Sequence, residues 1–203
     1  MRIGIYGGSF DPVHVGHLLV AETVREQIQL DQVLFIPAAQ SPLKLDYPPI
    51  AGRARVEMLQ LAIGGHPAFN VDDREIARGG VSYTVDTLRE LQSEQPGMEW
   101  FLLMGADSLV DLGRWKEPSE LCKHATPVVV ARGGSPVPDL ERIQPFVDAK
   151  RMNQIRQFVV KMPQFEISSR DLRVRIQNKK SIRYQVPASV EAYIASHQLY
   201  QTC

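Results

Sequence analysis

Two histidines stand three residues apart beside a glycine-rich stretch near the start of the chain, where they can bind a phosphate group. His14 and His17 flank Gly16, and imidazole N–H groups donate hydrogen bonds to phosphoryl oxygens. The residues that lead to this pair are Gly7, Gly8, Ser9, Phe10, Asp11, Pro12 and Val13. The glycines let the backbone approach a ligand, and a helix starting here would aim unpaired N–H groups and its positive dipole end at the same point. This stretch therefore predicts a phosphate cradle.

The same stretch has two other interpretations, a metal site and a plain helix cap. Zinc needs a further ligand besides His14 and His17, and no cysteine or histidine follows closely in the sequence, so we expect no metal here. A capping role for the two histidines stays open. No Gly-Lys-Ser/Thr follows, so this is not a Walker loop, and the G-x-G-x-x-G spacing of dinucleotide-binding loops is absent.

A second stretch with related chemistry runs from Ile167 to Arg173 and reads Ile-Ser-Ser-Arg-Asp-Leu-Arg. Ser168 or Ser169 can cap a helix that begins there. Arg173 would then lie one turn inside the helix, where a fixed cation can reach a triphosphate. Two serines before charged residues are also typical of an ordinary helix start. This stretch therefore indicates a functional site only in combination with the first stretch.

Both stretches resemble signatures of the nucleotidylyltransferase superfamily. The first matches Gly-x-Phe-x-Pro-x-His-x-Gly-His, and the second matches Ile-Ser-Ser-Thr-x-x-Arg except at Arg170, whose role stays open. The resemblance implies an enzyme that uses ATP, with His14 and His17 at the α-phosphate and Arg173 at the β and γ phosphates. It also implies ATP contacts at Gly7, Gly8, Ser9, Phe10, Gly16, Ile167, Ser168 and Ser169.

Further segments resemble nicotinate mononucleotide adenylyltransferases in particular. The segment from Ser82 to Thr87 begins a helix for which Thr84 is a suitable N-cap, leaving N–H groups for an anion such as a carboxylate. The resemblance implies that Tyr83, Thr84 and Val85 contact the mononucleotide. A capped surface helix without a ligand is the alternative.

The remaining acceptor segments follow expected strands. Gly105 and Asp107 come after one strand, and the resemblance implies that this turn contacts adenosine, with Asp107 accepting from ribose hydroxyls; a helix N-cap is the alternative for Asp107. Trp115 offers a flat face for stacking on a pyridine ring, and its polar neighbours favour partial exposure over the usual core position. A Pro-x-Lys segment ends at Lys44, which the resemblance places near the acceptor phosphate, although loop lysines are commonly just solvated.

The implied reaction is in-line attack by the phosphate of nicotinate mononucleotide on the α-phosphorus of ATP, giving deamido-NAD and pyrophosphate. The nucleophile is already anionic, so positioning and charge neutralisation suffice without a general base. Mg²⁺ is expected with ATP, held mainly by substrate and water. Alternatives are another acceptor, such as a pantetheine or polyol phosphate, and a nucleotide sensor without catalysis. His-x-Gly-His also resembles class I aminoacyl-tRNA synthetases, but this chain lacks their lysine-rich second loop, and we expect no nucleic-acid partner.

Such chemistry needs a scaffold that brings distant segments together. Short apolar runs predict buried strands at 2–6, 33–37, 100–104, 127–131 and 158–162. Helical spacing predicts helices at 16–29, 52–63, 85–95, 169–176 and 188–197. Their alternation predicts an α/β fold, a Rossmann-like doubly wound parallel sheet in one domain over 1–203, with ligands beyond the carboxyl ends of the strands. The stretch from Gly133 to Pro138, rich in glycine and proline, predicts a loop that can move.

Composition favours a cytoplasmic enzyme of one domain. The chain has 203 residues, and its basic and acidic residues both number 23, so no net charge attracts nucleic acid or an anionic membrane. Cys122 and Cys203 have no metal-site spacing and form no disulfide framework, which indicates a reducing compartment. We expect neither a signal peptide nor a membrane span. The oligomeric state stays open, a homo-oligomer included.

Overall fold

The protein is built on one six-stranded sheet of parallel strands. This computed structural model describes residues 1–46, 48–132, 138–163 and 165–201. The strands lie in the order β3-β2-β1-β4-β5-β6. They are β1 (Arg2–Gly8), β2 (Gln32–Pro37), β3 (Phe69–Val71), β4 (Glu99–Gly105), β5 (Thr126–Arg132) and β6 (Val159–Met162). The predicted Rossmann-like fold is confirmed, while β3 was missed because three residues are too short to form a readable apolar run.

Helices connect the strands. They are α1 (Val15–Gln27), α2 (Gly52–Ile63), α3 (Arg74–Arg78), α4 (Thr84–Glu94), α5 (Ala106–Val110), α6 (Pro118–His124), α7 (Ala149–Ile155), α8 (Ser169–Gln177) and α9 (Ala188–Ser196), with 3-10 turns at Leu112–Arg114 and Leu140–Phe146. The five predicted helices are present with small shifts at their ends. Four short helices were missed, since five to seven residues show too little of the helical period. Within the described residues, each helix is too short or too polar to span a membrane.

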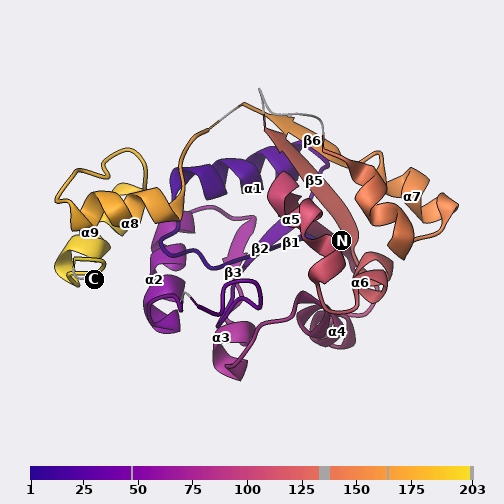
Figure 1. Cartoon of the computed structure of the whole chain (residues 1–203), viewed down its shortest axis with the longest axis horizontal. Helices are drawn as coiled ribbons and strands as arrows, with labels where there is room; N and C mark the ends of the chain where they lie inside the picture. Colours follow the sequence, from indigo (N-terminus) through magenta and orange to yellow (C-terminus); the bar gives the residue numbers. More distant parts are fainter. Residues whose placement is uncertain (47, 133–137, 164, 202–203) are drawn as a thin grey trace.

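The two faces of the sheet carry separate cores, because successive strand residues point to opposite sides. Phe35 and Leu103 belong to the core beneath α1, α2, α8 and α9. Leu34 and Leu102 belong to the core beneath α4 to α7, on the opposite side in Figure 1. Helices thus cover both faces, which makes the sheet doubly wound.

The carboxyl ends of the central strands meet at one edge of the sheet. Gly8 at the end of β1 pairs with Pro37 at the end of β2, and Ile5 pairs with Leu102 of β4. Strand β1 lies between β2 and β4, so the strand order reverses at this point. Ligands of open α/β sheets bind in the crevice outside the carboxyl ends where the order reverses. The segments that follow β1, β2 and β4 are therefore where a site is expected.

Candidate functional site

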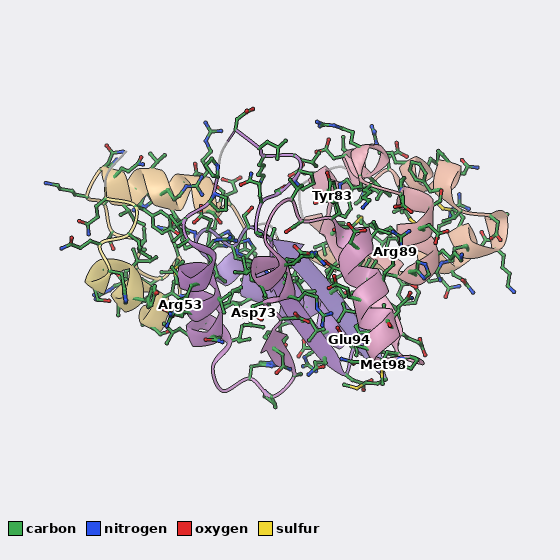
Figure 2. All side chains as sticks on the ribbon, turned by 90° about the horizontal axis from the view of Figure 1, so that it is seen from below. Arg53, Asp73, Tyr83, Arg89, Glu94 and Met98 are labelled. Atoms are coloured by element: carbon green, nitrogen blue, oxygen red, sulfur yellow. The ribbon has the colours of Figure 1, made fainter. Side chains whose placement is uncertain are left out.

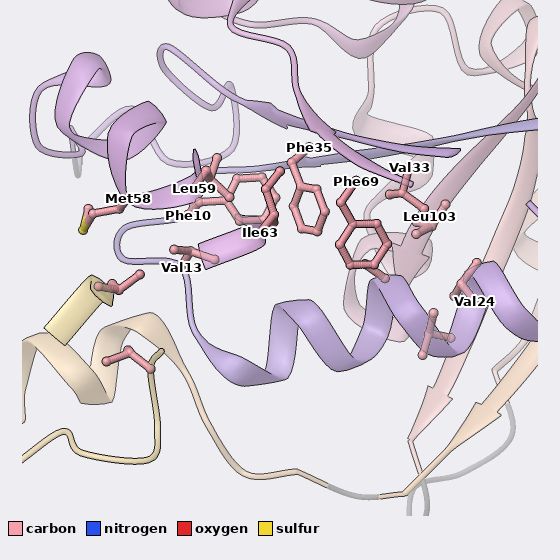
Figure 3. Packing of buried hydrophobic residues seen from close by; sticks show 14 of the residues in the cluster. Phe10, Val13, Val24, Val33, Phe35, Met58, Leu59, Ile63, Phe69 and Leu103 are labelled. Carbon is pink, nitrogen blue, oxygen red and sulfur yellow. The ribbon is translucent and has the colours of Figure 1, made fainter. Parts of the chain in front are cut away.

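The loop between β1 and α1 is anchored by Phe10. This residue has a φ of 47°, in the left-handed region that a bulky side chain rarely adopts, and it is 2% exposed. Figure 3 shows Phe10 among the buried residues; its ring centroid lies 5.8 Å from that of Phe35. Burial of the ring holds the strained backbone in place. By contrast, a Cβ at Gly7 would meet no atom within 4 Å, so the carboxyl end of β1 is open to a ligand.

His14 and His17 form a stacked pair at the start of α1. Their ring centroids are 3.6 Å apart with an interplanar angle of 23°. His14 is the N-cap residue and is buried, and its backbone N–H donates to Nδ1 of His17 at 3.2 Å. Because Nδ1 accepts there, neutral His17 carries its proton on Nε2, where it can donate to a phosphoryl oxygen. The pair therefore caps the helix and still presents a donor, so the two interpretations are compatible.

Gly16 is required by the same pair. A Cβ at this position would lie 3.0 Å from Nδ1 of His14, closer than side chains normally approach. Glycine thus leaves room for the imidazole to stack on His17. In the described ranges of the chain, His, Cys, Asp and Glu side chains form no group of three or more that could hold a metal ion.

The start of α8 is bonded directly to the loop after β1. Ser168 is the N-cap, as predicted, and its Oγ accepts from the backbone N–H of Asp171 at 3.1 Å. The hydroxyl of Ser169 donates to the carbonyl of Pro12 at 2.9 Å. Arg173 donates through Nη1 to the carbonyl of Asp11 at 2.7 Å. The two stretches that resemble one superfamily thus lie together, although they are far apart in sequence.

The other residues of the second stretch differ in exposure. Ile167 is half-buried and packs against the core beneath α8, which fixes the entry into the helix. Arg170 is exposed. The side chain of Arg173 is 34% exposed, so part of its guanidinium faces outward beside the loop.

Asp11 and Tyr200 extend this cluster, and sequence reasoning assigned neither a role. The hydroxyl of Tyr200 donates to Oδ1 of Asp11 at 2.7 Å, while Oδ2 lies 3.7 Å from Nη1 of Arg173. Burial, together with the adjacent Asp11 charge, raises the pKa of Tyr200, so its hydroxyl stays a donor. Asp11 lies inside the first signature, whereas nothing in the sequence around Tyr200 marks it.

The start of α4 differs from the prediction at one residue. Tyr83 is the N-cap and Thr84 is already the first helical residue, so the predicted capping role of Thr84 is wrong. The helix starts one residue early because the backbone of Tyr83 is extended after the bridge between Gln40 and Val81. No hydrogen bond among the described residues uses the backbone N–H of Thr84 or Val85. The predicted donors are therefore present, supplied by the backbone alone.

Trp115 follows the 3-10 turn after α5 and is half-buried, as its polar neighbours predicted. The adjacent Lys116 pairs with Asp86 of α4 at 2.8 Å, and its Nζ lies 4.9 Å from the centroid of the Tyr83 ring. These contacts join the Trp115 segment to the first turn of α4. Two of the proposed acceptor segments thus meet.

The turn after β4 is more open. Gly105 is both the last residue of the strand and the N-cap of α5, so the alternative N-cap role of Asp107 is wrong. Asp107 is exposed in the first turn of this helix. A Cβ at Gly105 would meet no atom within 4 Å.

Lys44 lies in the segment after β2 and is exposed. The side-chain amide of Gln40 donates to the Lys44 carbonyl at 2.7 Å, and the Gln40 carbonyl accepts from the N–H of Ser82 at 2.9 Å. The Lys44 segment is therefore tied to the approach to α4. The expected loop at 133–138 lies, except for Pro138, outside the described residues.

Comparisons with known proteins place the chain in a family. The cytidylyltransferase-like family profile matches residues 5–175. A protein of Rhodopirellula baltica named "Probable nicotinate-nucleotide adenylyltransferase" is 45% identical over 199 residues, 98% of this chain and 93% of that protein. A Thermus thermophilus protein of the same name is 43% identical over 201 residues, 99% of this chain and 100% of that protein.

The chain belongs to the nicotinate-nucleotide adenylyltransferase family. It is thus a nucleotidyltransferase. Among solved structures, the Plasmodium falciparum nicotinic acid mononucleotide adenylyltransferase complexed with NaAD has a TM-score of 0.79 to this chain at 19% identity. The match covers 98% of this chain and 97% of that one, and shows a shared fold.

Arg55 joins the loop after β1 to the segment after β2 in this adenylyltransferase-family chain. It was not among the residues predicted from the sequence. Its side chain lies on the buried face of α2 and is 1% exposed. Its guanidinium donates to the carbonyls of Ser9 and Ala38 at 2.7 Å each and to that of Ile50 at 3.1 Å. Burial lowers the pKa of Arg55, and the charge of Asp11 opposes this shift. The sequence feature that could have indicated a buried Arg55 is its position four residues before Leu59, on the same face of a predicted helix.

Replacing Arg55 with lysine is expected to lower the free energy of unfolding by about 2 to 4 kcal/mol. A single ammonium group lacks the planar fork that bonds several carbonyls, so buried carbonyls lose their donor. Urea unfolding of Arg55→Lys and of Arg53→Lys measures this. Arg53 is a matched control, since it lies on the same helix, is 89% exposed and pairs with Glu57. A loss of similar size in both variants would contradict the role of Arg55.

Proposed function

We propose that this chain transfers the adenylyl group of ATP to nicotinate mononucleotide, giving deamido-NAD and pyrophosphate in NAD biosynthesis. The observation that carries the proposal is the junction of the two signature stretches at the sheet edge, through the Ser169 bond to Pro12 and the Arg173 bond to Asp11. The names of full-length relatives support the same acceptor. The whole chain, 1–203, acts as one nucleotidyltransferase domain in this proposal.

ATP lies over the loop after β1 and the start of α8. The phosphate of the acceptor attacks the α-phosphorus in line and pyrophosphate leaves, so the protein positions two anions and offsets the charge of the transition state. His17 donates from Nε2 to the α-phosphate, with His14 stacked beside it. Arg173 binds the β and γ phosphates. The remaining ATP contacts are Gly7, Gly8, Ser9, Phe10, Gly16, Gly105, Asp107, Ile167, Ser168 and Ser169.

The acceptor lies over the start of α4. The free N–H groups of Thr84 and Val85 bind the carboxylate of the pyridine, and Trp115 stacks on the ring. Tyr83, the N-cap residue of the same helix, also contacts the mononucleotide. Lys44, exposed at the end of its segment, approaches the acceptor phosphate.

Magnesium enters with ATP as part of the substrate. The described side chains form no cluster for a metal ion, and the carboxylate of Asp11 already serves Tyr200 and Arg173. ATP phosphates and water are the ligands that Mg²⁺ prefers in such sites. The ion supplies charge neutralisation at the phosphates, and the protein residues orient them. A cytoplasmic setting fits the free buried Cys122, whose pKa burial raises to about 11.

The acceptor assignment predicts a preference for acid over amide. The carboxylate of nicotinate mononucleotide accepts from the N–H groups at the start of α4, whereas a carboxamide places its own donors there. One charge-assisted bond corresponds to a preference of roughly 10 to 150 fold in kcat/KM. Thr84→Ala should reduce the ratio of the two kcat/KM values only slightly and should not reverse it. The donors belong to the backbone, which this substitution leaves in place.

The measurement is pyrophosphate release and deamido-NAD formation with each mononucleotide at saturating ATP and magnesium. Pantetheine phosphate and a polyol phosphate complete the acceptor panel. Equal kcat/KM for acid and amide, or a preference for the amide, would overturn the acceptor assignment. Activity with pantetheine phosphate instead would keep adenylyl transfer and change the substrate.

A further inference from the structure

We propose that Glu75 is a positioning residue for the acceptor half of the site, holding the first turn of α4 and the segment after β2 in the arrangement that binds the mononucleotide. Glu75 lies on α3 and is 6% exposed, although carboxylates are rarely buried without a specific partner. None of the substrate contacts proposed above involves it. This inference rests on the proposed function.

The carboxylate of Glu75 is bonded from α4. The hydroxyl of Thr87, 1% exposed, donates to Oε1 of Glu75 at 2.6 Å. The same hydroxyl oxygen accepts from Nη2 of Arg78 at 2.9 Å, which fixes the direction of the hydroxyl proton. Thr87 lies one turn after Thr84, so this bond sets the rotation of the turn that carries the proposed donors.

Ser82 lies between the same carboxylate and the segment after β2. Its hydroxyl lowers the pKa of Glu75 and accepts from the backbone N–H of Ala39 at 2.9 Å. The N–H of Ser82 donates to the carbonyl of Gln40 at 2.9 Å. Glu75 thus lies next to both elements that the proposed function assigns to the acceptor: it bonds Thr87 of α4, and it neighbours Ser82, which is bonded to the segment after β2.

The charge balance around Glu75 explains why a carboxylate can be kept there. Burial raises the pKa of Glu75, while the Thr87 and Ser82 hydroxyls and the charge of Arg78 lower it, and Asp72 acts in the same direction as burial. The carboxylate accepts from the Thr87 hydroxyl beside the hydroxyl of Ser82, which an apolar side chain of similar size cannot do. Removing it leaves the buried hydroxyl of Thr87 without its acceptor.

A matched control exists on the same pair of helices. Glu94 accepts from Arg74 of α3 at 2.9 Å and is largely exposed, at the other end of α4 from Tyr83 (Figure 2). Glu94→Gln therefore weakens a contact between α3 and α4 without touching the first turn of α4. Glu75→Gln keeps an oxygen that can accept from Thr87 but removes the negative charge. It therefore tests whether the hydrogen bond or the charge of Glu75 positions the first turn of α4.

The test measures KM for each substrate together with the thermal unfolding midpoint. Glu75→Ala should raise KM for nicotinate mononucleotide about tenfold at saturating ATP, because displaced binding groups lose affinity, and leave KM for ATP within about twofold. Thr87→Val should shift KM in the same direction with little change in volume. Glu75→Gln should recover most of the loss, and Glu94→Gln should leave both KM values unchanged.

Two results would overturn the proposal. One is a mononucleotide KM within about twofold of wild type in folded Glu75→Ala, and the other is an equal rise in both KM values, as a general loss of structure would give. If Glu75→Ala does not fold, Thr87→Val decides by the same criteria. Wild-type chain that forms no deamido-NAD would overturn the proposed function, and this inference with it.

Discussion

Replacing His17 with alanine lowers kcat by an expected two to four orders of magnitude, roughly the range for a lost transition-state donor. His17 Nδ1 is already used as acceptor for the N–H of His14, so Nε2 is the nitrogen that carries a proton for the α-phosphate. Charge builds on the phosphoryl oxygens during transfer, which makes this donor stronger in the transition state than in the ground state. The effect should therefore fall on kcat more than on KM for ATP.

Two further variants separate the catalytic role of His17 from its capping role. His17→Asn keeps an acceptor near Nδ1 for the His14 N–H but loses the reach of Nε2, so stability should stay near wild type while kcat stays low. His17→Gln reaches further and should recover part of kcat. Rapid-quench single-turnover rates and thermal unfolding midpoints measure the two properties. A His17→Ala enzyme with kcat near wild type would remove His17 from the chemistry.

Replacing Arg173 with alanine lowers kcat/KM for ATP by an expected factor of about 100 to 1000. Its guanidinium is partly exposed beside the loop after β1, where it can meet the phosphates that become pyrophosphate. The contact exists in both the ground and the transition state, so KM for ATP should rise and kcat should fall. KM for nicotinate mononucleotide should change little.

Arg175 gives a matched control for this prediction. It lies two residues further along α8 and donates to the Ser181 carbonyl at 2.8 Å, away from the loop after β1. Arg175→Ala should leave ATP kinetics unchanged. Arg173→Lys should recover only part of kcat/KM, because an ammonium group cannot bond both Asp11 and phosphate in a planar fork. Unchanged ATP kinetics in Arg173→Ala would take Arg173 out of the site.

Short sequence patterns were sufficient to predict those features of the fold and the site that neighbouring residues determine. The glycines that end β1, the histidines at the start of α1 and the serines at the start of α8 could be found because each marks an end of a strand or a start of a helix. Trp115 was predicted to be half-buried from its polar neighbours, as it is. The link between the two signature stretches was predicted from their resemblance to one superfamily, and the two stretches lie together in the structure.

Other features depend on partners that the sequence does not show. Arg55 is satisfied by backbone carbonyls, which carry no sequence signal, and Glu75 accepts from a hydroxyl on another helix. The N-cap of α4 was misplaced because threonine is the better capping residue in isolation, whereas the bridge at Val81 sets where the chain turns. Strand β3 pairs with β2 at the edge of the sheet, and its three residues are too few to show this pairing in the sequence.

The bonds that complete the proposed ATP side of the site join residues that are made at very different times. Ser169 and Pro12 are 157 positions apart, and Tyr200 and Asp11 are 189 apart. On a ribosome, the loop after β1 therefore emerges long before these partners are made. Contacts of such long range also form late in folding, since the chain entropy of closing the loop is lost first. A nascent chain can therefore build most of its sheet before the loop after β1 meets the residues that hold it.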